Sequence, residues 1–177
     1  MLLRILVVVL LIVGVLIFAV TRPDIVRIER SITINASPER IFPLINDFHN
    51  WSRWAPQDRE DPGIRRTYAG SASGEGAISD WTGTGSTGSG RMLITKSVPS
   101  TNVAVTVDWV KPFAAHNLNE FTLEPHGATT RVIWSMQGTN VYVMKLMSVF
   151  TNTDRFMGKH FETGLANLKT AAESGGR

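Results

Sequence analysis

Apolar residues change their spacing along this chain, and each spacing predicts a different kind of element. Ile5 to Val20 is apolar without interruption and shows no helical period. From Ile25 onward, apolar and polar residues alternate over short runs, which is typical of half-buried β-strands. From Val143 to Ala172, apolar residues recur at steps of three and four, which predicts a helix with one apolar stripe. The pattern therefore predicts an apolar leader, a sheet and a long closing helix.

Seven strands are expected, separated by turns rich in Gly, Pro and Asn. In the first, Ile25 to Asn35, the residues Ile28, Ile32 and Ile34 share one face. Short connections between the later strands indicate antiparallel hairpins. The six further strands are expected at Arg65 to Ala69, Ala77 to Trp81, Arg91 to Val98, Val103 to Val110, His116 to Leu123 and Thr129 to Gln137.

Two short helices are expected after the first strand. Ser37-Pro38-Glu39 is typical of a helix start, because serine caps, proline suits the first helical position and glutamate complements the helix dipole. Pro43 removes a backbone donor, so this helix should end or kink near Asn46. Asp47 can cap a second short helix that Pro56 closes.

The closing helix should have two halves. The first, from Val143 to Phe150, has almost no polar residue, which means that it is covered or faces a hollow. Thr151 to Asp154 interrupts the pattern, and Asp154 can cap a restarted helix. The second half carries a stripe on one face, made of Met157, Phe161, Leu165, Leu168 and Ala172.

The apolar leader predicts a membrane anchor. Ile5 to Val20 would form a helix of about 24 Å, and Leu2 and Leu3 extend it toward the roughly 30 Å of a hydrocarbon core. Arg4 can reach the headgroups. We therefore expect a single-pass N-terminal anchor in residues 1–22 and a separate domain in residues 23–175.

Two alternatives to an anchor stay open for the leader. A cleaved signal peptide would need small residues before the cleavage site, and Ala19-Val20-Thr21 is a poor match. A helix buried in a soluble core would show a polar stripe, which is missing. Arg4 on one side, against Arg22, Arg27 and Arg30 on the other, leans weakly toward a cytoplasmic domain, and either side stays possible.

Length and composition narrow the function classes. Beyond the leader, the 177-residue chain has room for one domain of about 150 residues with a single core. The absence of cysteine excludes disulfides and thiolate chemistry. The net charge of +3 comes from scattered basic residues rather than a basic face, so no nucleic-acid partner is expected. The sequence gives no indication of oligomeric state.

One segment matches the dinucleotide-binding fingerprint letter for letter. Gly83-Thr84-Gly85-Ser86-Thr87-Gly88 has the right glycine spacing, but a strand is expected after it instead of a helix N-terminus that would receive a pyrophosphate. We therefore expect a flexible loop, and no nucleotide or other cofactor.

The sequence contains no pattern typical of a metal site or a catalytic triad. His49, His116, His126 and His160 have no zinc-binding spacing, and no serine occupies a nucleophile elbow. The acidic cluster Asp58, Glu60 and Asp61 lacks the spacing of a calcium loop, which favours a solvated loop. No metal is expected.

The large aromatic residues indicate where an apolar pocket could lie. Trp109 shares its strand face with three valines, Trp134 with Val132 and Met136, and Phe121 with Leu123, so these rings should point toward the closing helix. Rings beside flexible methionines suit an adaptable apolar pocket, although a sheet that grips a helix also needs them for packing alone.

The order of elements and several local motifs resemble the SRPBCC superfamily, the START-like and polyketide cyclase/dehydrase group. The matching segments are Arg30-Ser31-Ile32, Ala36-Ser37-Pro38, Ile45-Asn46-Asp47-Phe48 with Trp51, Trp54 and Pro56, Tyr68, Gly70, Gly74, Gly76-Ala77, Gly90-Arg91-Met92, Lys111-Pro112-Phe113, Met144-Lys145-Leu146-Met147, Gly158-Lys159, Phe161-Glu162, Gly164-Leu165 and Leu168-Lys169. The resemblance covers nearly all of Ile25 to Ala172 and is closest to membrane-anchored bacterial members. It implies an α+β helix-grip fold, in which a curved antiparallel sheet wraps a long C-terminal helix around a cavity for apolar molecules.

The leading hypothesis is a membrane-tethered domain that binds a lipid-like or other hydrophobic small molecule. The expected ligand-binding residues are Trp54, Trp81, Trp109, Phe121, Trp134, Met144, Met147, Phe150, Met157 and Phe161. One alternative is a cyclase or dehydratase, whose acid and base would come from Asp80, Asp108, His116, Glu120 and His160. Another is an interaction or stress-related module with a solid core.

Overall fold

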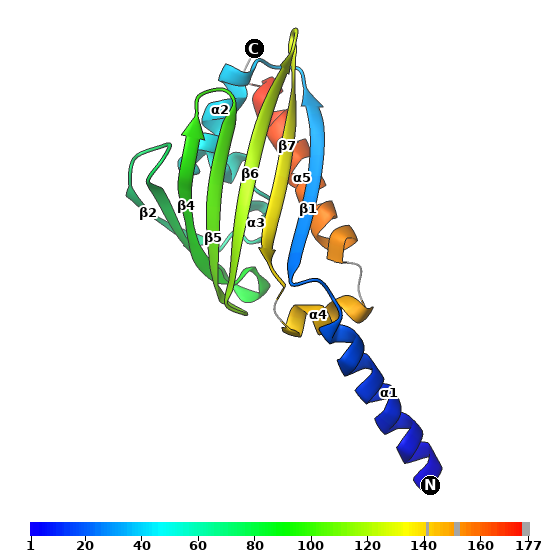
Figure 1. Ribbon diagram of the computed structural model, residues 1–177. Coiled ribbons are helices and arrows are strands. Elements are labelled where there is room, and N and C mark those ends of the chain that lie inside the picture. Colours follow the sequence, from blue (N-terminus) through cyan, green and yellow to red (C-terminus); the bar gives the residue numbers. More distant parts are fainter. Residues whose placement is uncertain (141, 151–152, 175–177) are drawn as a thin grey trace.

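The computed structural model describes residues 1–140, 142–150 and 153–174, and it confirms the α+β helix-grip architecture (Figure 1). A curved seven-stranded antiparallel sheet has the order β1-β7-β6-β5-β4-β3-β2 and wraps around one face of helix α5. The strands are β1 (Ile25–Ile34), β2 (Arg65–Gly70), β3 (Ala77–Thr82), β4 (Ser89–Val98), β5 (Asn102–Lys111), β6 (Ala115–His126) and β7 (Thr129–Thr139).

The alternation of the sequence determines which side chains face the helix. In β6, Asn119, Phe121 and Leu123 are buried, whereas the residues between them are partly exposed. Phe121 lies opposite Trp134 of β7 in the register, and the two ring centroids are 5.0 Å apart. The inward face of the sheet therefore forms one continuous apolar surface.

The segment after β1 forms three short helices. Helix α2 (Pro38–Asn46) begins after Ser37 and ends at Asn46, as the sequence predicts, and it contains Pro43. The 3-10 helix η1 (Phe48–Arg53) follows, capped by Asp47, whose carboxylate accepts a hydrogen bond from the His49 amide at 2.9 Å. A further helix, α3 (Pro56–Glu60), starts at the proline that the sequence pattern placed at a helix end.

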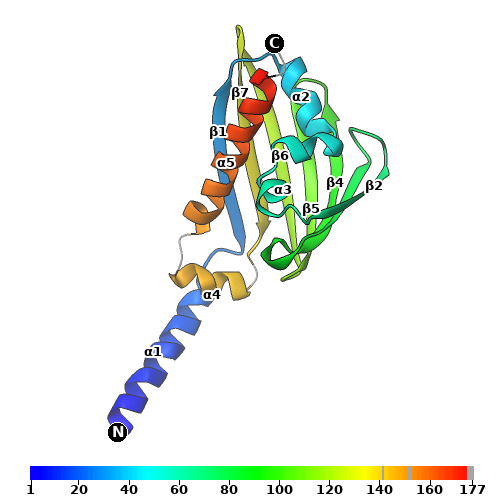
Figure 2. The same ribbon diagram turned by 180° about the vertical axis from the view of Figure 1, so that it is seen from behind.

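The closing helix is divided where the sequence predicts it, but Asp154 lies in the first turn of the second helix instead of capping it. Helix α4 comprises Tyr142–Phe150, and α5 comprises Thr153–Ser174. Figure 2 shows α5 lying across the concave face of the sheet, with α2 and α3 beside it. Gly164 of α5 brings the helix close to the sheet, because a Cβ atom there would lie 2.7 Å from the Trp134 ring.

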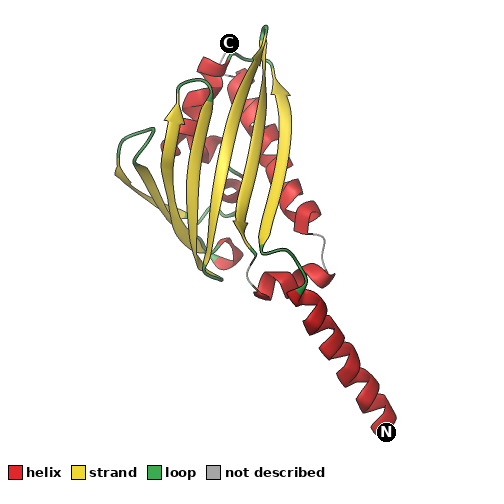
Figure 3. Cartoon of the chain, viewed as in Figure 1, coloured by secondary structure: helices red, strands yellow, loops and turns green. Residues whose placement is uncertain are grey.

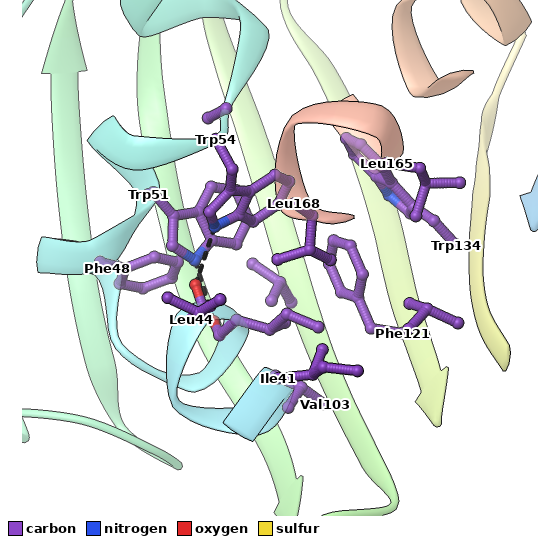
Figure 4. Close-up of a cluster of buried hydrophobic side chains, with 14 of the residues drawn as sticks. Ile41, Leu44, Phe48, Trp51, Trp54, Val103, Phe121, Trp134, Leu165 and Leu168 are labelled. Carbon is purple, nitrogen blue, oxygen red and sulfur yellow. Dashed lines mark hydrogen bonds between the residues drawn. The ribbon is translucent and has the colours of Figure 1, made fainter. Parts of the chain in front are cut away.

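The most tightly packed part of the core lies between α2, η1, α5 and the sheet (Figure 4). Trp54 is fully buried and donates from its indole nitrogen to the Leu44 carbonyl oxygen at 2.8 Å. Its ring packs edge-on against Phe121 and Trp134, with centroids 5.9 and 5.8 Å away. Leu165 and Leu168 close the cluster from α5.

One polar side chain on the inward face of β1 links the strand to α5. Arg30 donates to the carboxylates of Asp154 and Glu162, both at 2.9 Å. Its guanidinium group lies against Gly158, where a Cβ atom would overlap it. The inward position of an arginine in a strand of isoleucines is explained by these contacts.

Helix α1 (Leu2–Val20) extends away from the domain and is mostly exposed (Figures 1 and 3). Residues Leu3–Val20 are long and apolar enough to cross a membrane, as an anchor or as a signal sequence. The helix contacts α4, which lies between it and the sheet. The possibility that this helix is buried in a soluble core is therefore wrong for the part of the chain described.

Candidate functional site

A cavity of about 650 Å³ lies between the sheet and the first turns of α5. Its wall combines inward-facing residues of the strands with residues of α3 and α5 and of the loop between β5 and β6. Sites for small molecules occupy about 300 to 1,000 Å³, so the cavity can hold a ligand of that size.

Along most strands, the inner face of the sheet borders the cavity at one end and the solid core at the other. In β5, Val107 and Trp109 line the cavity, whereas Val103 and Val105 are fully buried in the core. The lining residues are those nearer the end of the sheet at which α1 and α4 lie (Figure 1). The cavity thus occupies the half of the domain close to α1.

The closing helix follows the same division. Met157 and Phe161 of α5 line the cavity, and Leu165 and Leu168 lie in the core. Phe161 stacks on Trp134 with centroids 4.1 Å apart and an interplanar angle of 5°, and both rings form part of the wall. This stacked pair is the boundary between the packed and the hollow halves of the domain.

The four tryptophans of the wall present apolar surface to the cavity, because their N–H groups already have partners in the protein. Trp51 donates to the Ile45 carbonyl oxygen at 2.9 Å. Trp134 donates to the Asn119 side-chain oxygen at 2.9 Å. Trp81 donates to the Thr87 carbonyl oxygen at 3.4 Å. Trp109 donates to Asn117 at 3.2 Å when the Asn117 amide is oriented to satisfy both of its neighbours. A ligand therefore does not have to satisfy these donors, and apolar contact suffices.

Asn119 gives the inner wall a polar group. Its oxygen accepts from Trp134, which fixes the orientation of the amide, and its NH₂ group has no acceptor among the described residues. The side chain is buried and lines the cavity. The amide nitrogen is therefore a hydrogen-bond donor that faces the cavity.

A buried ion pair forms another part of the wall. Arg66 of β2 donates to both carboxylate oxygens of Asp58 in α3, at 2.8 and 2.7 Å, and their side chains are only 9% and 7% exposed. Because Asp58 compensates the charge of Arg66, the pair does not make an anion site. It anchors α3 to the edge of the sheet.

The acidic segment after η1 is therefore structural, and the expectation of a solvated loop is wrong for Asp58 and Asp61. Asp61 is buried and accepts from the Thr84 amide at 2.6 Å and from the Thr84 hydroxyl at 2.5 Å. The hydrogen bond from the Thr84 side chain holds the pKa of the Asp61 carboxyl below its usual range. These contacts tie the glycine-rich loop to the end of α3.

His160 is the histidine that lines the cavity. Burial lowers the pKa of its imidazole, and the charge of Glu60 opposes that effect only in part. His160 is therefore more often neutral at neutral pH than an exposed histidine is, which suits an apolar wall.

His160→Gln is expected to reduce the pH dependence of stability. Below the ordinary histidine pKa of about 6.5, the unfolded chain binds a proton before the folded chain does, because the folded pKa is lower. Stability contributed by neutral His160 is thus present above about pH 6.5 and is lost as pH falls through the folded pKa. Thermal unfolding of the full-length protein between about pH 7.5 and 5 measures this, and an equal slope in wild type and variant would contradict it.

The structure brings together half of the residues expected to bind a ligand. The residues that line the cavity are Trp81, Trp109, Trp134, Met157 and Phe161. Trp54 and Phe121 are fully buried in the solid core, beyond the cavity wall. Met144, Met147 and Phe150 belong to α4, and their side chains lie outside the described residues.

Several wall residues were missed by the sequence analysis. Asn117 and Asn119 share the strand parity of Phe121, a signal that could have placed them on the inner face. Arg66 and Glu60 carry no such signal, because their position depends on how α3 packs against the sheet.

The candidate acids and bases of an enzyme do not converge on the cavity. Only His160 of the five lines it. Asp80 is paired with Arg91 at 2.6 Å, and Asp108 contacts His116 at 2.6 Å through side chains that are more than half exposed. Glu120 accepts from Asn102 at 3.0 Å. Of the expected acids and bases, the cavity wall therefore contains His160, with Glu60 as a further titratable group.

The glycine-rich segment has the local structure that the sequence pattern predicts. The 3-10 turn η2 (Gly85–Thr87) is followed by strand β4 instead of a helix. In the described part of the chain, no group of three or more His, Cys, Asp or Glu residues has the geometry to hold a metal ion.

Fold and cavity together define the class of protein, a helix-grip domain with an internal apolar cavity. Residues 26–173 match the family described as "Polyketide cyclase / dehydrase and lipid transport", and the chain belongs to this family. No curated protein sequence matches the chain.

Solved structures show the same fold. TTHA0849 from Thermus thermophilus aligns with a TM-score of 0.63 and 14% identity, covering 86% of this chain and 100% of its own. CV1439 from Chromobacterium violaceum aligns with a TM-score of 0.59 and 15% identity, covering 86% and 99%. The Aha1 dimer from Colwellia psychrerythraea aligns with a TM-score of 0.57 and 22% identity, covering 86% and 99%. At these identities the likeness concerns the fold alone.

Proposed function

We propose that this protein binds a lipid-like or other hydrophobic small molecule in the cavity between its sheet and α5, while residues 1–22 tether the domain of residues 23–175 to a membrane. The observation that carries the proposal is the cavity of about 650 Å³ next to a fully packed core. A chain that needed only a solid core could pack this half as densely as the other half.

The chemistry of the wall supports an apolar ligand with one polar group. The rings of Trp81, Trp109 and Trp134 have their N–H groups satisfied and offer dispersion and burial. Met157 adds an adaptable apolar side chain on α5. Asn119 offers a donor to one ligand oxygen. Membership of the polyketide cyclase/dehydrase and lipid transport family agrees with ligands of this kind.

A cyclase or dehydratase would need acid and base groups at the cavity, and of the five acids and bases expected from the sequence only His160 lines it, beside Glu60 and Lys159. The remaining candidates are engaged in contacts outside the cavity wall. Binding is therefore the function that the geometry supports best.

The proposal predicts that full-length protein, purified in mild detergent, retains apolar molecules from the expressing cells. Extraction with organic solvent followed by mass spectrometry should find one class of amphiphile in near-stoichiometric amount. An equal amount of an unrelated single-span protein, purified in the same detergent, is the control for lipids carried by the micelle. A lipid profile identical to that of the control would contradict the proposal.

A further inference from the structure

Part of the cavity wall is exposed at the end of the domain from which α1 extends, and there it is apolar. Phe113, in the loop between β5 and β6, is 50% exposed, and Phe156, in the first turn of α5, is 76% exposed. The other exposed wall residues include Glu60, Lys159 and Thr163, which lie on α3 and α5 and are polar. The cavity therefore reaches the surface beside two large exposed rings.

The contact between α4 and α1 indicates how close this end of the domain lies to the membrane. The Tyr142 hydroxyl donates to the carbonyl oxygen of Leu16 at 3.4 Å, and Leu16 lies inside the apolar span of α1. Leu16 precedes the last residue of α1 by four positions, which is about 6 Å along a helix. If α1 crosses a bilayer, the start of α4 lies at the depth of its last turn, in the interfacial region.

Several contacts join α4, and Asn140 before it, to the segment between α1 and β1. Arg22 donates to the Ser148 carbonyl oxygen at 3.3 Å, and Lys145 forms an ion pair with Asp24. The hydrogen bond from Lys145 lowers the pKa of the Asp24 carboxyl. The Asn140 side chain donates to the Pro23 carbonyl oxygen at 2.9 Å. The base of the domain is thus fastened to the end of the span.

The connecting segment is also short. Four residues, Thr21 to Asp24, separate α1 from β1, and even fully extended they span no more than about 14 Å. This reach keeps the first residues of β1 within about 14 Å of the end of the span, in or just outside the headgroup region, which is about 5 to 7 Å deep on each side. Val26, near the start of β1, is itself part of the cavity wall.

Charge near the opening suits an anionic lipid surface. Lys111 precedes the exposed loop that carries Phe113, and Lys159 lies one turn beyond Phe156. Both lysines are exposed, and neither has an ion-pair partner in the part of the chain that the structure describes. The nearby carboxylates of Asp24, Asp154 and Glu162 are paired with Lys145 or Arg30, whereas the exposed Glu60 of the wall has no ion pair among the described residues. Unpaired lysines beside apolar rings are typical of surfaces that rest on lipid headgroups.

We propose that α4 and the rim formed by Phe113 and Phe156 rest in the interface of the leaflet from which α1 emerges, so that the cavity opens directly to that leaflet. The partner is the bilayer itself. The ligand class is then a membrane-resident amphiphile, which passes between leaflet and cavity without crossing bulk water. The ligand part of this inference rests on the proposed function, whereas the seating of the rim follows from the geometry of α1 and α4.

The chain contains no cysteine, so a single introduced cysteine gives a unique labelling position. We would label Phe113→Cys and Phe156→Cys with an environment-sensitive nitrobenzoxadiazole dye in the full-length protein. The matched control is Val98→Cys, because Val98 is also an exposed apolar residue but ends β4 at the opposite end of the sheet. The vesicles would contain phosphatidylcholine with a minority of phosphatidylglycerol, with and without nitroxide-labelled lipid.

Blue-shifted emission at positions 113 and 156, quenched by nitroxide lipid at least about fivefold more than at position 98, is the expected result. Emission typical of water at all three positions would overturn the inference. A parallel titration of the unlabelled protein in detergent with a fluorescent fatty acid separates the two proposals. If the labels at positions 113 and 156 both report water while the protein binds the fatty acid saturably, only the placement of the rim in the membrane is refuted. If both labels report lipid while no saturable fatty-acid binding occurs, only the proposed function is refuted.

Discussion

Replacing Trp54 with alanine is expected to lower the free energy of unfolding by about 3 to 5 kcal/mol, the cost of removing a large ring from a solid core. Trp54 is fully buried, contacts Trp51, Phe121 and Trp134, and donates a hydrogen bond to Leu44. The variant also leaves that carbonyl oxygen without its partner. Thermal unfolding of the full-length protein, followed by near-UV circular dichroism, measures the loss.

Trp109→Ala is the matched comparison. The Trp109 ring is only partly buried, borders the cavity and makes one edge-on contact with Trp81 at 5.0 Å. We expect a clearly smaller loss of stability than for Trp54, together with ligand binding weaker by about 1 to 3 kcal/mol. Equal destabilisation by the two variants would mean that Trp109 is as tightly packed as the core and would contradict the division into a packed and a hollow half.

The second large effect concerns Val107 and Val105, which lie two residues apart on the same face of β5. Both valines belong to the buried core, but Val107 also lines the cavity, whereas Val105 is fully buried and does not. Val107→Trp should extend an indole ring into the cavity, cost clearly less stability than Val105→Trp and weaken ligand binding at least about tenfold. Val105→Trp should overpack the core and cost about 1 to 3 kcal/mol or more.

Denaturant unfolding and ligand titration of both variants provide the test. Because the two substitutions are chemically identical and share one strand face, any difference between them reports the space in front of each valine. Severe destabilisation by Val107→Trp, similar to that by Val105→Trp, would show that the cavity is not available to an added ring.

Most of the fold could be predicted from local pattern. The alternation in β5, β6 and β7 and the turn residues between them placed every strand within a few residues of its observed bounds. Thr151 to Asp154 correctly predicted the division of the closing helix, because threonine, asparagine and aspartate favour helix starts over helix interiors. Helix α3 was missed since it is only five residues long and begins at Pro56, which serves equally well as an end or a start.

The boundary between cavity and core could not be predicted in the same way. Strand parity correctly placed Phe121, Trp134 and Trp109 on one face, yet Phe121 lies wholly in the core, Trp134 lies at the boundary and Trp109 lines the cavity. The difference depends on which turn of α5 and which short helix cover each level of the sheet. That is a property of tertiary packing, which residue spacing within a strand does not encode.

The burial of two polar residues depends on partners in other elements of the fold. Arg30 has the parity of a core residue and is accommodated only because Gly158, more than a hundred residues later, leaves room for its guanidinium group. Asp58 similarly belongs to a segment that looks solvated, and its burial depends on Arg66 across the gap to β2. Neither partner could be inferred from the residues on either side.

The central claim, that the cavity holds an apolar ligand, is tested most directly by energy transfer. Full-length protein in mild detergent would be titrated with a polyene fatty acid whose absorption overlaps tryptophan emission, since Trp81, Trp109 and Trp134 all lie in the cavity wall. The account predicts saturable quenching with one molecule per chain in the wild type, reduced at least about tenfold in affinity by Val107→Trp. Quenching that never saturates, or that is identical in wild type and Val107→Trp, would contradict it.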